Sequence, residues 1–218
     1  AMQAESGAVQ RFTYRELAEM VDRIAVGLHR LGVRSGDVVA SQLPNWWQFT
    51  ALYLACSRIG AVMNPLMHIF RERELGFMLA HGEAKVLVVP KMFRGFDHEA
   101  MALGLQANLP HLRHVVAIGG DGDNSFEKLL SGPAWEREAD AQQILTAHRP
   151  GPDDVTQLIY TSGTTGKPKG AMHTANTLYA NIVPYAERLA LGPDDVVLMA
   201  SPMAHQTGFM YGLMMPIV

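Results

Sequence analysis

The residues of this chain best suited to binding phosphate are concentrated in one segment, residues 160–170, with the sequence YTSGTTGKPKG. It combines three glycines, four serine or threonine hydroxyls and two lysines. Glycine lets the backbone approach a ligand closely, so that its N–H groups can point at phosphate oxygens. The hydroxyls can donate neutral hydrogen bonds, and the lysines carry positive charge. This composition predicts a polyphosphate site, and a flexible surface loop is the alternative.

Two common nucleotide-binding motifs do not fit this segment. A Walker A loop needs a glycine, four further residues, and then Gly-Lys followed by serine or threonine. Here Gly166 and Lys167 are followed by Pro168, and Thr161 stands where the first glycine would be. No G-x-G-x-x-G follows the preceding apolar run, so a dinucleotide fingerprint fails too. The segment therefore indicates a phosphate site of another design.

The segment resembles the phosphate-binding signature of the adenylate-forming, or AMP-binding, superfamily, which includes acyl-CoA synthetases and peptide-synthetase adenylation domains. Five further segments are similar to that family: FTYREL (12–17), LGVRSGDVVA (31–40), LPN (43–45), GAVMNP (60–65) and SPMAHQTGF (201–209). The resemblance is closest to acid–CoA ligases, in particular those for short- to medium-chain acids or cyclohexanecarboxylate. A peptide-synthetase adenylation domain and a non-catalytic nucleotide-binding module are the alternatives.

The resemblance implies a two-step reaction in which ATP and an acid give acyl-AMP and pyrophosphate, and coenzyme A then captures the acyl group. ATP, Mg²⁺ and coenzyme A are the expected cofactor and co-substrates, and the other partner is a small carboxylic acid. Lys169 is expected to stabilise charge on the phosphates, and Thr161 to bind both nucleotide and Mg²⁺. The remaining expected phosphate ligands are Ser162, Gly163, Thr164, Thr165, Gly166 and Lys167, although Lys167 could instead be solvated.

His205 is the second candidate catalytic residue. It follows a predicted strand over residues 195–200, and in open α/β sheets ligands bind beyond the carboxyl ends of strands. The resemblance places this histidine near the acyl carboxylate and the α-phosphate. It would orient the substrate there, because a carboxylate at pH 7 needs no base. Apolar residues follow at 209–213, which favours a compact apolar acid over an amino acid.

Composition indicates a globular protein, with 48% hydrophobic and 18% charged residues. A net charge of −3 gives no general attraction to nucleic acid or to anionic membranes, and no apolar run is long enough to span a membrane. Cys56 lies among apolar residues, so we expect a buried structural thiol. A single cysteine and the absence of a leader-like N-terminus favour the reducing cytoplasm. A homo-oligomer is compatible with these features.

Alternating helix-like and strand-like segments predict an α/β fold with a largely parallel sheet and flanking helices. Thr13 and Glu16 form a capping box at the start of the first helix. The expected further helices cover 45–59, 71–80, 97–106 and 176–191, with Pro184 kinking the last one or ending its first half. The expected strands cover 37–42, 61–63, 85–89, 114–118, 155–160 and 195–200.

We expect a first α/β subdomain over 1–150 and the start of a second over 151–218. The apolar run 214–218 and the short segment before residue 9 suggest an interior piece of a longer protein. The resemblance agrees with this, because the family's ribose-binding aspartate and its adenylating lysine are expected beyond Val218. The segment by itself is therefore expected to be inactive.

Overall fold

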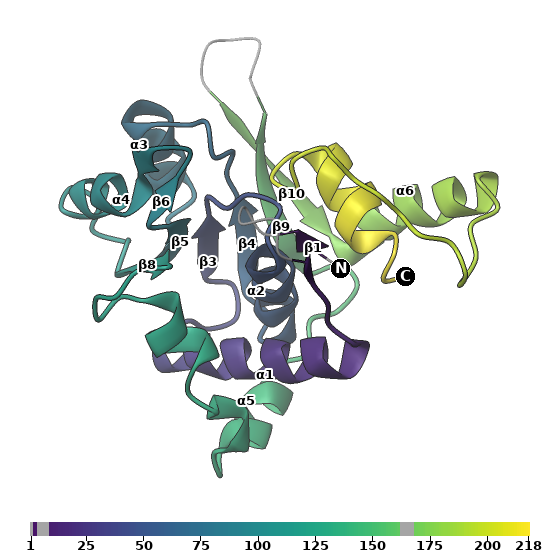
Figure 1. The fold of residues 1–218 in the computed structure, drawn as a ribbon, viewed down its shortest axis with the longest axis horizontal. Coiled ribbons are helices and arrows are strands. Elements are labelled where there is room, and N and C mark those ends of the chain that lie inside the picture. The colour runs from purple at the N-terminus through teal and green to yellow at the C-terminus, as the bar shows by residue number, and fades with distance from the viewer. Residues whose placement is uncertain (1, 4–8, 162–167) are drawn as a thin grey trace.

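The computed structural model describes residues 2–3, 9–161 and 168–218. At its centre is a six-stranded sheet in the order β10-β9-β4-β3-β5-β8 (Figure 1). Its strands are β3 (Val38–Ser41), β4 (Val62–Pro65), β5 (Val86–Pro90), β8 (His114–Ile118), β9 (Val155–Thr161) and β10 (Lys169–Thr174). The first five run parallel, and only β10 is antiparallel to its neighbour. The predicted α/β class with a largely parallel sheet is confirmed.

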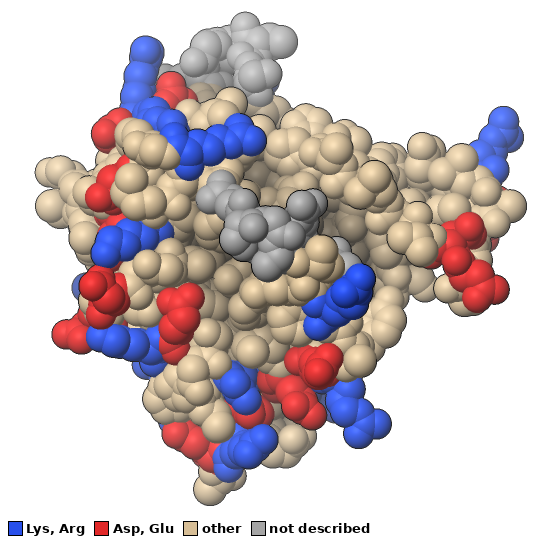
Figure 2. Space-filling view, viewed as in Figure 1, with Lys and Arg blue, Asp and Glu red and all other residues tan. Residues whose placement is uncertain are grey.

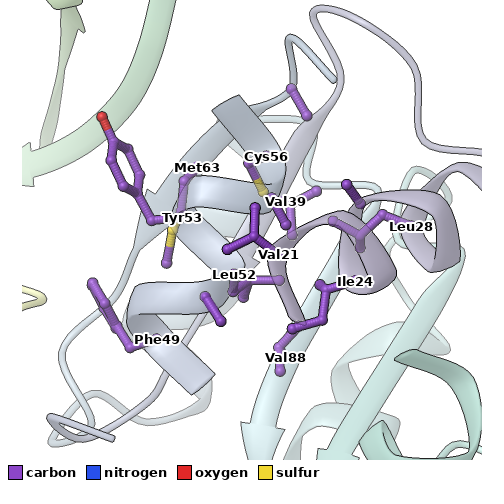
Figure 3. Close-up of a cluster of buried hydrophobic side chains, with 14 of the residues drawn as sticks. Val21, Ile24, Leu28, Val39, Phe49, Leu52, Tyr53, Cys56, Met63 and Val88 are labelled. Atoms are coloured by element: carbon purple, nitrogen blue, oxygen red, sulfur yellow. The ribbon is translucent and has the colours of Figure 1, made fainter. Parts of the chain in front are cut away.

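Four helices cover the two faces of the sheet: α1 (Tyr14–Arg30) and α2 (Trp47–Arg58) on one, α3 (Glu72–His81) and α4 (His98–Gln106) on the other. Strand residues alternate between the faces, so that Val39 packs with α1 and α2 whereas Ala40 packs with α3 and α4. Figure 3 shows the first of these cores, in which Leu52 and Met63 pack beside Cys56. Cys56 is buried as expected, and burial raises the pKa of its thiol.

The capping box predicted for the first helix is present. Thr13 Oγ1 accepts a hydrogen bond from the Glu16 backbone N–H at 3.2 Å, and the Thr13 N–H donates to the Glu16 carboxylate at 2.7 Å. After the helix, Gly32 adopts a φ of 84°, a left-handed conformation that glycine adopts without strain. Local sequence signals therefore place both ends of α1.

Smaller elements complete the fold. Two short antiparallel pairs, β1 (Met2–Gln3) with β2 (Val9–Gln10) and β6 (Met92–Phe93) with β7 (Phe96–Asp97), lie outside the main sheet. The π-helix η1 (Glu127–Ser131), the 3₁₀ turn η2 (Trp135–Arg137) and α5 (Ala141–Ala147) pack against α1. Figure 2 shows basic and acidic side chains interspersed over the end of the molecule formed by α1 and α5.

Two predictions for the C-terminal third are wrong. Residues 195–200 form no strand, and the side chains of Val196 and Leu198 are 94% and 92% exposed. A strand needs a hydrogen-bonding neighbour, and in the described part of the chain this segment has none. Conversely, residues 169–174 form β10, for which no strand was predicted. The helix α6 (Ala175–Arg188) was predicted, and Pro184 lies within it.

The sheet crosses the boundary expected at residue 150. Strand β9 lies after this boundary and pairs with β4, which lies before it. The division into subdomains 1–150 and 151–218 remains a prediction.

His98 is a buried titratable group, only 1% exposed, at the start of α4. Its Nδ1 lies 3.0 Å from Gln42 Oε1, while Gln42 Nε2 donates to the Met67 and Phe70 carbonyls. Gln42 Oε1 therefore accepts, so Nδ1 of the neutral ring carries the proton. Burial, with smaller contributions from Arg71 and His68, lowers the pKa of His98 to about 4.

This depressed pKa predicts a loss of stability in mild acid. In the unfolded chain the imidazole takes up a proton near its ordinary pKa of 6.5, whereas the folded protein resists protonation down to about 4. The contribution is thus complete above pH 6.5 and is lost as the pH falls toward 4. Because of His98, the free energy of unfolding measured by urea denaturation should be about 2 kcal/mol lower at pH 4.5 than at pH 7.5. In His98→Asn, the free energy of unfolding should differ less between these two pH values. The control His111→Asn, at an exposed histidine, should not reduce this difference.

Candidate functional site

Thr161 and Lys169 face each other across the edge of the sheet. Thr161 is the last residue of β9, at its carboxyl end, and Lys169 is the first residue of β10. The antiparallel register pairs the two residues directly, and both are exposed. The residues between them that were predicted to bind phosphate, Ser162, Gly163, Thr164, Thr165, Gly166 and Lys167, lie outside the described residues. The described geometry therefore fixes the two ends of the predicted phosphate-binding segment.

Lys169 lies in a strand and not in a loop as expected. Ladder hydrogen bonds to β9 restrain its backbone. Lys169 forms no ion pair with any residue that the structure describes. Its charge is therefore not neutralised within this part of the chain and can act on a bound anion.

Tyr160 anchors the end of β9 against α3. Its hydroxyl donates to the Met78 carbonyl at 3.2 Å and lies 2.9 Å from Nδ1 of His81. Burial raises the pKa of this phenol. Tyr160 is thus a packing residue, and it holds the strand that positions Thr161.

His205 lies in a turn just before the π-helix η3 (Gly208–Met214), and not at a strand end as predicted. The turn is closed by the His205 N–H, which donates to the Pro202 carbonyl at 2.9 Å. Nδ1 of the exposed ring accepts from the Thr207 N–H at 3.3 Å, so in the neutral ring the proton is on Nε2. The turn therefore directs an N–H donor outward, which suits binding of an anionic oxygen.

The structure brings Thr161 and Lys169 together, but no hydrogen bond among the described residues joins either of them to His205. The helix α6 links the two regions, because it packs against both β10 and η3. On the η3 side, the Tyr211 hydroxyl donates to Asn181 Oδ1 at 2.7 Å. Figure 1 shows α6 extending to one side of the sheet, with η3 above the chain's C-terminus.

Two residues beside His205 were not assigned a role from the sequence. Asn45 precedes α2, and its side chain donates to the Ser201 carbonyl at 2.9 Å and accepts from the Met203 N–H at 2.7 Å. Gly208 packs so closely that a Cβ atom there would lie 2.2 Å from the Pro202 carbonyl oxygen. The LPN motif at 43–45 was noted for its resemblance alone, and nothing in the sequence pairs it with residue 201.

The described residues contain neither a cluster suited to binding a metal ion nor a helix suited to spanning a membrane. No group of three or more histidine, cysteine, aspartate or glutamate side chains there could hold a metal ion. The placement of Mg²⁺ at Thr161 therefore remains a prediction. No helix in the described ranges has the length and apolarity needed to cross a membrane.

A largely parallel α/β sheet, with a threonine and a lysine paired at its edge on either side of the segment predicted to bind phosphate, is the arrangement expected of a nucleotide-binding class of protein. A sequence model of the family described as "AMP-binding enzyme" matches residues 1–218. The chain belongs to the AMP-binding enzyme family.

Curated relatives agree with this assignment. The chain is 36% identical over 207 residues to a medium-chain fatty-acid–CoA ligase of Escherichia coli K12, covering 95% of this chain and 36% of the relative. It is 36% identical over 199 residues to a 2-hydroxy-7-methoxy-5-methyl-1-naphthoate–CoA ligase of Streptomyces carzinostaticus, covering 89% of this chain and 36% of that relative. The chain thus spans little more than a third of the length of these relatives.

Solved structures show the same fold. The apo structure of MatB from Rhodopseudomonas palustris superposes with a TM-score of 0.78 at 27% identity, covering 97% of this chain and 38% of that one. A long-chain-fatty-acid–CoA ligase from Archaeoglobus fulgidus gives a TM-score of 0.78 at 27% identity, covering 100% and 41%. The predicted superfamily is therefore confirmed.

Proposed function

We propose that this chain is the N-terminal part of an ATP-dependent carboxylic acid–CoA ligase. The observation that carries the proposal is the direct pairing of Thr161 with Lys169 at the two ends of the segment rich in glycine and hydroxyl residues. Membership of the AMP-binding family and similarity to several acid–CoA ligases support it. The alternative of a peptide-synthetase adenylation domain is not favoured by these relatives.

The described residues suit a nucleotide. Lys169 supplies a cation without an ion-pair partner in the described part of the chain, and Thr161 supplies a hydroxyl at the opposite position. Residues 162–167 would complete the phosphate site with backbone N–H groups and hydroxyls. Mg²⁺ would bind to phosphate oxygens and to Thr161, neutralising negative charge on the triphosphate. ATP supplies the adenylyl group, which turns a poor acyl donor into a reactive mixed anhydride.

The protein's own contribution would be to hold two anions close together and to stabilise charge that develops on the leaving pyrophosphate. Lys169 would do this electrostatically, from a backbone position restrained by the sheet. His205 would donate from Nε2 to the acid carboxylate or to the α-phosphate, orienting the substrate without taking up a proton. Coenzyme A would capture the acyl group in the second step.

We further propose that the acid is compact and apolar. Residues 206–215 carry no charged side chain that could pair with the ammonium group of an amino acid. The side chain of Phe209 is fully buried and packs against Tyr53, with ring centroids 4.6 Å apart. It therefore supports residues 206–215 by core packing and does not line an open pocket. The two relatives described above are named for a medium-chain fatty acid and a substituted naphthoate, and both names fit an uncharged acyl group.

The full-length protein is expected to exchange labelled pyrophosphate into ATP only when a suitable acid is present. The panel would contain cyclohexanecarboxylate, butyrate, octanoate, benzoate, palmitate and several amino acids. A higher kcat/KM for a short, medium or alicyclic acid is expected, and coenzyme A should then yield the thioester. No exchange with any acid would overturn the ligase proposal. Preference for palmitate or an amino acid would overturn the proposed acid class alone.

A further inference from the structure

The structure assigns Asn45 as a positioning residue for His205, an inference that rests on the proposed ligase function. Asn45 directly precedes Trp46, the N-cap of α2, and that helix start has no side-chain cap. An asparagine at a helix start commonly accepts hydrogen bonds from the helix's own N–H groups. Here the amide instead binds the backbone of Ser201 and Met203, more than 150 residues away in sequence.

The Asn45 side-chain amide forms hydrogen bonds with the backbone of the residues on either side of Pro202. Its NH₂ donates to the Ser201 carbonyl at 2.9 Å, and its oxygen accepts from the Met203 N–H at 2.7 Å. Pro202 between them has no N–H of its own. Both contacts are partly buried, so removing the amide would leave a donor and an acceptor without their partner.

One further hydrogen bond connects the segment that Asn45 holds to His205. The Pro202 carbonyl, held between the two bonded residues, accepts from the His205 N–H at 2.9 Å and so closes the turn. The His205 carbonyl in turn accepts from the Phe209 N–H at 2.9 Å, which joins the turn to η3. A shift at Ser201 or Met203 is therefore passed directly to the histidine backbone.

The helix α2 supports this turn at more than one point. Besides Asn45 at its start, Thr50 contacts the Met203 sulfur at 3.9 Å, and Tyr53 packs edge-on against Phe209. Since α2 also packs in the central core, it gives the His205 turn a rigid base. Asn45 supplies the polar part of this support, with good geometry for two hydrogen bonds.

A double-mutant cycle in the full-length protein tests this role by pyrophosphate exchange. Asn45→Ala is expected to lower kcat about tenfold with little change in KM for ATP. In a His205→Ala background the same change should cost less than twofold, because the residue that it positions is gone. Asn45→Asp, which can still accept from Met203 but cannot donate to Ser201, should be intermediate. The matched control is Asn181→Ala, which removes a hydrogen bond to Tyr211 of η3 and should cost the same small factor in both backgrounds.

A second readout does not depend on catalysis. The ¹⁵N signals of the His205 ring report which nitrogen carries the proton, and in the parent protein they should show the Nε2–H form. Asn45→Ala should shift these signals toward a mixture of tautomers, and Asn181→Ala should not. Equal losses of kcat in both backgrounds, with unchanged ring signals, would reduce Asn45 to a structural residue. A parent protein with no exchange activity but with the expected ring signals would refute the ligase function and leave the positioning geometry intact.

Discussion

Lys169→Ala is expected to lower the rate of acid-dependent adenylation about a hundredfold in the full-length protein. Removing one group aimed at charge in a transition state typically costs about 3 kcal/mol, which corresponds to that factor. Lys169 is exposed at the start of β10 and forms no ion pair with described residues, so folding should not depend on its charge. Pyrophosphate exchange measures the rate, and thermal unfolding checks that the variant is folded.

The matched control for this change is Lys128→Ala. Lys128 is also exposed, and it donates to the Asp121 carbonyl at 2.8 Å, away from the sheet edge where Lys169 lies. This variant should adenylate at nearly the parent rate. Lys169→Arg keeps the charge with a different donor geometry and should recover part of the rate. If Lys169→Ala and the predicted phosphate-site variant Thr164→Ala both adenylated at nearly the parent rate, the segment would be scaffold and not a phosphate site.

Gly208→Ala is expected to abolish most of the adenylation activity by displacing the His205 turn. A Cβ atom at this position would lie 2.2 Å from the Pro202 carbonyl oxygen and 2.6 Å from that of Ser201. Both obstacles are backbone atoms, so the turn itself must move. A displacement of about 1 Å at a reacting group can cost roughly a hundredfold in rate. The same strain should lower the free energy of unfolding by about 1–3 kcal/mol.

Gly192→Ala serves as the control, because nothing lies within 4 Å of a Cβ atom at that glycine. It should change neither activity nor the urea midpoint by a measurable amount. For Gly208→Ala, rate and stability should fall together. Parent-like kcat in a folded Gly208→Ala protein would show that the position of the turn is not important for catalysis.

Local sequence signals determined most of the individual elements. The capping box at Thr13 and Glu16 and the left-handed Gly32 bracket α1, because each depends on neighbours three or four residues away. Apolar runs such as 85–89 and 114–118 predicted β5 and β8, since strands buried on both faces of a parallel sheet are continuously apolar. The composition of residues 160–170 likewise predicts a phosphate site from residue types alone.

Strand pairing was decided by the tertiary structure. Residues 195–200 have an apolar strand-like pattern but no partner in the described chain, so they form no strand. Residues 169–174 are partly exposed and carry a weak pattern, yet they form β10 because β9 offers its edge. A strand is completed by hydrogen bonds to another segment, and a single segment's sequence does not reveal that partner.

The surroundings of His205 likewise depend partly on the sequence and partly on the tertiary structure. The sequence singled out this histidine as a site residue, but its protonated nitrogen follows from the Thr207 N–H, and its turn is held by Asn45 from far along the chain. Residue types determine which chemistry is available, because a side chain carries its donors, acceptors and charge wherever it lies. Tertiary contacts determined where the turn that carries His205 lies, since they bring together segments that the sequence keeps more than 150 residues apart.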